Sequence, residues 1–296
     1  MRIGTRGSAL ALVQAESVAS LLGEATGIVT IVTAGDRGAD QLDKSRWVSA
    51  LEQALLEDRI DVAVHSAKDV PTEPVAGLEL VAVPARANAR DAICGAAGLT
   101  ELAPGARIGT SSLRRAAQIR AAREDVEVVD LRGNVDTRLR KLSEGHVDAL
   151  VLAFAGLERL QREGEAGGLL AELIPAAGQG ALAVQARPGT LDPEALARIN
   201  DEPSMACIAA ERELVHALGA TCNTPVGAYA EMLLGGNARL TGWVGLPDGS
   251  AWLRDQVEAP AAEVGAMCAE RMLAGGAAGL LEEAMTAAVV EREPAR

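Results

Sequence analysis

The chain of 296 residues is longer than one hydrophobic core usually organises, so we expect two or three domains. Its formal net charge of −13 argues against nucleic acid and anionic lipid as partners, because an acidic surface repels both. Four cysteines lack a zinc-type spacing, so we expect free thiols and no metal: Cys94, Cys207, Cys222 and Cys268. The sequence shows neither a signal-peptide pattern nor an apolar run of about 18 residues, so we expect a cytoplasmic protein.

The first part of the chain alternates short β-branched runs with helical stretches. Strands are predicted at 2–5, 28–33, 60–65 and 78–83, and helices at 8–22 and 48–58, with Ser8 as the N-cap of the first helix. This βαβ rhythm predicts a mostly parallel sheet covered by helices.

A second copy of the pattern begins near residue 88. Residues 107–110 (RIGT) repeat residues 2–5, and each copy is followed by serine and a predicted helix, 8–22 in the first and 112–123 in the second. Residues 147–151 echo residues 60–64 in the same order. Each match is short enough to arise by chance, but the shared order and context favour two similarly built α/β domains.

The last part of the chain has a different organisation. The turn-rich segment 175–180 (PAAGQG) leads to a strand at 181–185, and a helix at 204–218 precedes a loop that contains Cys222. Strands at 226–231, 238–244 and 251–257 and a helical region within 261–290 follow, which indicates a small α+β domain. We therefore predict domains at 1–84 with 181–200, at 88–176 and at 203–296.

Two helix starts carry groups that suit anions. Thr5–Ser8 and Thr110–Arg115 each place hydroxyl and backbone N–H groups at the carboxyl end of a predicted strand, where ligands of α/β sheets bind. Arg114 and Arg115 add fork-shaped donors for carboxylates. In the alternative reading, the serines only cap helices and the arginines lie on the surface.

Further charged residues follow other predicted strands. Lys68 and Asp69 leave the strand at 60–65, where a carboxylate could hold a proton or stabilise a developing cation, or could simply cap a turn. Arg132, Arg138 and Arg159 follow strands of the second copy and lie in or near a basic run at 107–141. That run suits a small anionic ligand in a cleft, or else a solvated helix face.

Seven segments, taken together and in order, resemble the hydroxymethylbilane synthase (porphobilinogen deaminase) family: RIGTRGSALALVQA, VAVHSAKDVP, GTSSLRR, LRGNVDTRL, DALVLAFAGLERL, PAAGQGALAV and CNTPVGAYA. The resemblance implies two periplasmic-binding-protein-like (type II) α/β domains and a small α+β domain. It also implies a monomeric cytoplasmic transferase of haem biosynthesis, which condenses four porphobilinogen molecules into linear hydroxymethylbilane and releases ammonia at each step.

The same resemblance assigns roles to individual residues. It implies a dipyrromethane cofactor joined to Cys222 as a thioether, and Asp69 as the catalytic carboxylate. The residues implied in holding the cofactor, besides Cys222, are Lys68, Asp69, Ser112, Arg114 and Arg115. Those implied in holding substrate are Arg6, Ser8, Thr110, Ser111, Arg132, Arg138 and Arg159.

The chain departs from the family pattern in two loops. Residues 34–47 form a shorter version of a glycine- and lysine-rich loop, with Lys44 matched to a loop lysine and Trp47 where phenylalanine is usual. Ala220-Thr221 replace a Gly-Gly pair before Cys222. Two alternatives follow: a paralogue with low turnover, and a two-lobed cytoplasmic sensor of small anions, although a sensor does not explain the cysteine loop.

Overall fold

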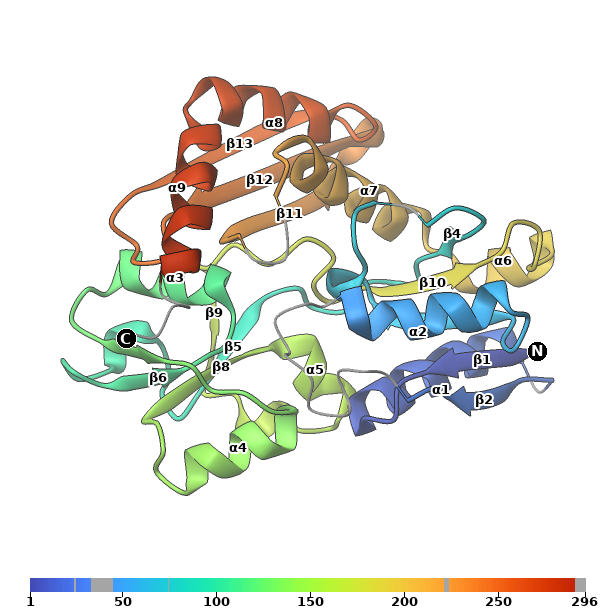
Figure 1. Ribbon diagram of the computed structural model, residues 1–296, viewed down its shortest axis with the longest axis horizontal. Helices are drawn as coiled ribbons and strands as arrows, with labels where there is room; N and C mark the ends of the chain where they lie inside the picture. Colours follow the sequence, from blue (N-terminus) through green and yellow to red (C-terminus); the bar gives the residue numbers. More distant parts are fainter. Residues whose placement is uncertain (24, 33–44, 74, 221–223, 291–296) are drawn as a thin grey trace.

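The computed structural model describes residues 1–23, 25–32, 45–73, 75–220 and 224–290. Figure 1 shows two α/β lobes side by side, with a third unit packed over both. Lobe 1 is named here for the sheet that begins at the N-terminus, lobe 2 for the sheet of the middle of the chain, and the third unit for the C-terminal sheet. The predicted fold class, two similar α/β lobes and a small α+β unit, is confirmed.

Lobe 1 is a five-stranded sheet in the order β2-β1-β3-β10-β4. Its strands are β1 (Arg2–Thr5), β2 (Gly27–Thr30), β3 (Val62–Ser66), β4 (Glu79–Ala82) and β10 (Leu182–Ala186), and its helices are α1 (Ala9–Leu22), α2 (Ser45–Leu56) and α6 (Pro193–Ile199). The expectation of a mostly parallel sheet is confirmed, because β1, β2, β3 and β4 run in one direction and only β10 runs antiparallel, to both β3 and β4. This strand returns from lobe 2 and therefore enters the sheet from the opposite end.

Lobe 2 repeats this topology in the order β7-β6-β8-β5-β9, with β5 antiparallel to its two neighbours. Its strands are β5 (Asp91–Cys94), β6 (Arg107–Gly109), β7 (Glu127–Val129), β8 (Ala149–Ala153) and β9 (Gly168–Leu170), and its helices are α3 (Leu113–Ala122), α4 (Val135–Ser143) and α5 (Phe154–Arg159). The lobes contact each other where α5 lies against α1 (Figure 1). They are joined by two crossovers, residues 83–90 and 171–181.

The repeated RIGT segment has the same structural role in each lobe. A Cβ atom on Gly4 would lie 2.2 Å from the end of the buried Ile60 side chain, and one on Gly109 would lie 2.7 Å from the end of the buried Leu131 side chain, so in both lobes glycine lets a buried side chain pack against the strand. A serine then caps the next helix, with Ser8 Oγ accepting from the Ala11 N–H and Ser112 Oγ from the Arg115 N–H. The predicted N-cap at Ser8 is confirmed.

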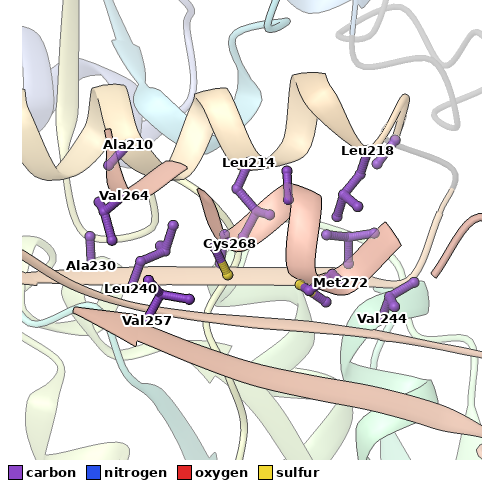
Figure 2. Packing of buried hydrophobic residues seen from close by; sticks show 14 of the residues in the cluster. Ala210, Leu214, Leu218, Ala230, Leu240, Val244, Val257, Val264, Cys268 and Met272 are labelled. Carbon is purple, nitrogen blue, oxygen red and sulfur yellow. The ribbon is translucent and has the colours of Figure 1, made fainter. Parts of the chain in front are cut away.

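The third unit consists of α7 (Glu202–Ala217), a three-stranded antiparallel sheet of β11 (Val226–Met232), β12 (Asn237–Gly245) and β13 (Trp252–Pro260), and the helices α8 (Val264–Ala274) and α9 (Ala277–Val290). Figure 2 shows its core, where Leu214 of α7 and Cys268 and Met272 of α8 belong to one apolar cluster with the strand residues Leu240 and Val257. The helical region predicted within 261–290 is interrupted at Gly275 and Gly276, and Gly276 has a φ of +99° that favours glycine.

The third unit is anchored to both lobes. Arg86 of the first crossover forms a buried ion pair with Glu211 of α7, with Nη1 2.6 Å from Oε1. Arg120 of α3 donates to the Pro247 carbonyl at 2.7 Å, in the turn between β12 and β13. Cys94, Cys207 and Cys268 are buried free thiols, and no helix of the described residues is long and apolar enough to cross a membrane.

Candidate active site

Asp69 lies in a single 3-10 turn, η2 (Ala67–Asp69), at the carboxyl end of β3. The Ala67 N–H donates to the Ala181 carbonyl at 3.0 Å, and the Val70 N–H closes the turn on the Ala67 carbonyl at 3.2 Å. Gly178 of the second crossover packs so closely that a Cβ on it would lie 2.8 Å from the Ala67 carbonyl carbon. The turn is therefore fixed at the edge of the sheet where the sequence predicted a ligand.

A small cavity of about 90 Å³ opens beside this turn. It lies between the start of α1 and the end of β3, and the Gln14 amide donates to Ser66 Oγ at 2.9 Å on its wall. Its polar lining consists of Arg6, Ser8, Gln14, His65, Ser66 and Asp69. Three residues that the sequence predicted, Arg6, Ser8 and Asp69, thus share one cavity.

His65 is buried next to Asp69 and was not predicted as a site residue. Burial lowers the pKa of its imidazole to about 4, against the opposing effects of Gln185 and the Asp69 charge, while the Arg6 charge also lowers the pKa. The ring is therefore neutral near pH 7. Its Nε2 atom is buried without a hydrogen-bond partner among the described residues.

Arg114 and Arg115 lie at the start of α3 and share one buried carboxylate. Arg114 Nη2 is 2.9 Å from Asp91 Oδ2, and Arg115 Nη2 is 2.7 Å from Asp91 Oδ1. Burial alone would raise the pKa of Asp91, but the charges of the two guanidinium groups outweigh it and hold the pKa well below its usual range. Two cations against one anion leave a positive charge at this strand end.

Gln179 connects the two lobes at this cluster. Its Nε2 donates to Asp91 Oδ1 at 2.8 Å and to the Ala89 carbonyl at 2.7 Å. Its Oε1 accepts from Lys68 Nζ of lobe 1 and from the Nη2 atoms of Arg114 and Arg115 of lobe 2, each at 3.5 Å. The predicted residues Lys68, Arg114 and Arg115 are therefore brought together.

The remaining predicted arginines differ in their surroundings. Arg138 donates to Ser111 Oγ at 3.1 Å, and burial together with the Arg115 charge lowers its pKa to about 10. Arg159 donates to the Gly180 carbonyl at 2.7 Å, and burial lowers its pKa. Arg132 instead forms an exposed ion pair with Asp130, with Nε 2.9 Å from Oδ2. Arg138 joins the cluster at α3, whereas Arg132 pairs with Asp130, whose charge also acts on Arg138.

Two hydroxyl groups at the start of α3 have local structural partners. Ser112 Oγ caps the helix, and the Ser112 N–H donates to Thr110 Oγ1 at 3.2 Å. The alternative interpretation, that the serine at this helix start caps the helix, is therefore confirmed for Ser112. Cys222 and Lys44 lie outside the described residues, and α7 ends five residues before the cysteine.

Sequence reasoning missed His65, Asp91, Gln179 and the Arg86–Glu211 pair. Gln179 stands between two glycines in the PAAGQG segment, and a long polar side chain in such a tight turn was a usable signal. Asp91 precedes the apolar run AIC, so a buried ion pair was one possible interpretation of that pattern. His65 is in a quoted motif, but nothing in the motif indicates its burial.

Comparisons with known proteins give a consistent picture. The family model for the porphobilinogen deaminase dipyrromethane cofactor-binding domain matches residues 1–194, and the model for the porphobilinogen deaminase C-terminal domain matches residues 205–274. A porphobilinogen deaminase of Deinococcus deserti is 45% identical, with 95% of this chain and 98% of the relative covered. One of Brevibacillus brevis is 43% identical, with 96% and 97% covered. Among solved structures, the methionine-binding protein MetQ has a TM-score of 0.43 at 13% identity, covering 67% of this chain and 87% of that protein.

Proposed function

The chain belongs to the porphobilinogen deaminase family and is a hydroxymethylbilane synthase, a transferase that polymerises porphobilinogen, and we propose which of its residues perform the reaction. Its cofactor is dipyrromethane. We assign the thioether attachment to Cys222 and the catalytic role to Asp69. The observation that carries the proposal is the placement of Asp69 in a cavity with Arg6 and Ser8, while Lys68, the residue before Asp69, contacts Arg114 and Arg115 through Gln179.

The residues around Asp91 suit a group that carries acetate and propionate. The two positive charges of Arg114 and Arg115 exceed the single negative charge of Asp91. In addition, Arg114 Nε is buried without a hydrogen-bond partner among the described residues. Carboxylates of the cofactor would supply the missing anions, held by Arg114, Arg115, Lys68 and Ser112. When bound, the dipyrromethane supplies the pyrrole carbon to which the first substrate is joined.

Asp69 acts on the incoming substrate. Loss of ammonia from porphobilinogen leaves positive charge on its pyrrole ring, and a carboxylate beside the ring nitrogen stabilises that charge. The 3-10 turn holds the Asp69 backbone on both sides of the residue, so the carboxylate is positioned before the charge develops. Such preorganisation is worth most in a site that excludes water.

The arginines hold the carboxylates of substrate and growing chain. Arg6 and Ser8 lie in the Asp69 cavity, and Arg138 with Ser111 and Arg159 lie near the second crossover and α3. Burial weakens the solvation of Arg138 and Arg159, and an incoming carboxylate compensates each charge. Thr110 and Arg132 complete the proposed substrate set, with Arg132 released from Asp130 to reach the chain.

We also propose a cytoplasmic monomer without nucleic acid or membrane partners, in line with the net charge of −13. The domain division 1–84 with 181–200, 88–176 and 203–296 stays a prediction, supported by the three separate sheets. The comparisons do not favour a sensor of small anions. The shorter loop that suggested a paralogue with low turnover lies mostly outside the described residues.

The test measures conversion of porphobilinogen to hydroxymethylbilane by the purified holoenzyme, together with the Ehrlich colour of bound pyrroles. We expect steady turnover and pigment in the wild type, and neither in Cys222→Ala. Cys207→Ala is the matched control, because Cys207 is buried within the third unit. Pigment that persists in Cys222→Ala would refute the attachment site, and a pigmented wild type without turnover would indicate the low-activity paralogue.

A further inference from the structure

Arg212 of α7 holds the backbone that follows the Asp69 turn. Its Nη1 donates to the Val70 carbonyl at 3.0 Å, and its Nη2 donates to the Pro71 carbonyl at 2.6 Å. Burial lowers the pKa of this guanidinium. A planar fork with two donors fits two successive carbonyls in a way that a single ammonium group does not.

These two carbonyls lie directly after the 3-10 turn. The entry side of the turn is fixed by the hydrogen bond from Ala67 to Ala181 and by the close packing of Gly178, both within lobe 1 and the second crossover. The exit side is fixed by Arg212, which belongs to the third unit. The position of Asp69 therefore depends on a side chain from outside its own lobe.

Helix α7 is itself held firmly against lobe 1. Ile208, one turn before Arg212, is fully buried and packs in one cluster with Ala67 and Val70. The neighbouring residue Glu211 accepts from Arg86 and from the Gly178 N–H, at 2.6 and 2.7 Å. Any shift of α7 would therefore strain several contacts at once, so Arg212 presents its two donors at a fixed place.

The same helix leads to the cysteine loop. Helix α7 ends at Ala217, and the described chain continues to Ala220, two residues before Cys222. Helix α7 thus connects the proposed attachment site of the cofactor with the backbone beside the proposed catalytic carboxylate. Arg212 is the polar contact of α7 with the two residues that follow Asp69.

We propose that Arg212 is a positioning residue for Asp69, which sets the place of the carboxylate relative to the cofactor-bearing unit. The proposal rests on the proposed function of Asp69 and Cys222. A displacement of about 1 Å in an active site can cost on the order of 10²-fold in rate. Loss of the fork should therefore reduce kcat by about 10- to 100-fold, with KM within about threefold, because Arg212 does not lie in the Asp69 cavity.

The experiment compares Arg212→Met, Arg212→Lys and Arg120→Met as pigmented holoenzymes. Arg120→Met is the matched control, because Arg120 also donates to a backbone carbonyl across the boundary of the third unit, but away from Asp69. We expect Arg212→Met to keep its Ehrlich pigment and KM and to lose kcat, Arg212→Lys to recover part of the rate, and Arg120→Met to retain it. A kcat of Arg212→Met within twofold of wild type, or an equal loss in Arg120→Met, overturns the proposal.

A double-mutant cycle separates positioning from a general structural role. In an Asp69→Ala background, Arg212→Met should reduce the residual rate by less than about threefold, because the carboxylate that it positions is gone. Full additivity of the two substitutions overturns the proposal. If Arg212→Met does not fold, Arg212→Lys decides: kcat within twofold of wild type overturns it. Failure of Asp69→Ala to slow the wild type would refute the proposed function instead.

Discussion

The two lobes are alike at one end of their sheets and different at the other. At the start of β1, Asp61 accepts from the Arg2 N–H and pairs with its guanidinium, both at 2.6 Å. At the start of β6, Asp148 does the same for Arg107, at 2.8 and 3.0 Å. The repeated sequence RIGT thus includes an arginine and a glycine that close and pack the strand in the same way in both lobes.

At the carboxyl ends of the strands the two lobes carry different side chains. In lobe 1, β3 leads into the turn that holds Asp69, whereas in lobe 2 the equivalent strand β8 leads into α5 and Arg159. The start of α3 in lobe 2 also carries Arg114 and Arg115, which are held by Asp91. The scaffold is shared where it stabilises the sheet, and it differs at the proposed site: lobe 1 carries Asp69 with Lys68 and Arg6, whereas lobe 2 carries Arg114 and Arg115 around the buried Asp91.

The largest expected effect is on stability, at the buried ion pairs of lobe 2. Asp91→Asn leaves two buried guanidinium groups without their counter-ion, which should lower the free energy of unfolding by about 3–5 kcal/mol. Urea unfolding checks this. Asp130→Asn, which breaks an exposed pair with Arg132 in the same lobe, should cost less than about 1 kcal/mol. Equal losses would contradict the view that lobe 2 is organised around Asp91.

The next effect is on rate, at the acid of lobe 1. Asp69→Asn keeps the size of the side chain but removes its charge, and we expect the turnover of porphobilinogen to fall by about 10²- to 10³-fold with pigment retained. Asp61→Asn, at the opposite end of the same sheet, should leave turnover unchanged. A normal rate in Asp69→Asn would remove this residue from the mechanism.

A smaller effect concerns pH, and it depends on His65. The unfolded chain binds a proton at this residue near pH 6.5, whereas burial delays protonation in the folded protein to about pH 4. The unfolded state therefore binds more protons between these values, and stability falls as the pH is lowered, by about 3 kcal/mol at most. Chemical denaturation across pH 4–7 should show this fall in the free energy of unfolding in the wild type and not in His65→Gln. Parallel curves for the two proteins would show that His65 is not buried as described.

The smallest effect tests the likeness of the lobes. Asp61→Ala and Asp148→Ala each break an exposed pair with the arginine of the RIGT segment, and each should cost less than about 1 kcal/mol in urea unfolding. Neither should change turnover. A large loss for one variant alone would show that the two pairs are not equivalent.

Much of the scaffold could be predicted because it depends on local sequence. Ser8 was predicted as an N-cap from its position before an apolar helical pattern, and the structure confirms it. The RIGT repeat identified both lobes. The antiparallel course of β10 could not be predicted, since it depends on the chain returning from lobe 2 through the second crossover, and no short segment encodes that return.

The site was predictable in its residue types but not in its pairing. Arg114 and Arg115 were predicted as ligands for carboxylates, and they are buried against Asp91, a residue more than 20 positions earlier in the chain. Gln179 is about 90 positions from the carboxylate that it contacts. Such contacts are set by packing of the two lobes, which a single sequence does not reveal. The cysteine loop stays a prediction, because residues 221–223 lie outside the described part of the chain.

The most direct test of the account is the intact mass of the purified protein after denaturation, with the modified peptide then located by proteolysis. The account predicts the added mass of two linked pyrrole units on the peptide that contains Cys222, and an unmodified chain for Cys222→Ala. An active wild-type protein without added mass, or a pyrrole adduct on any other residue, would contradict it.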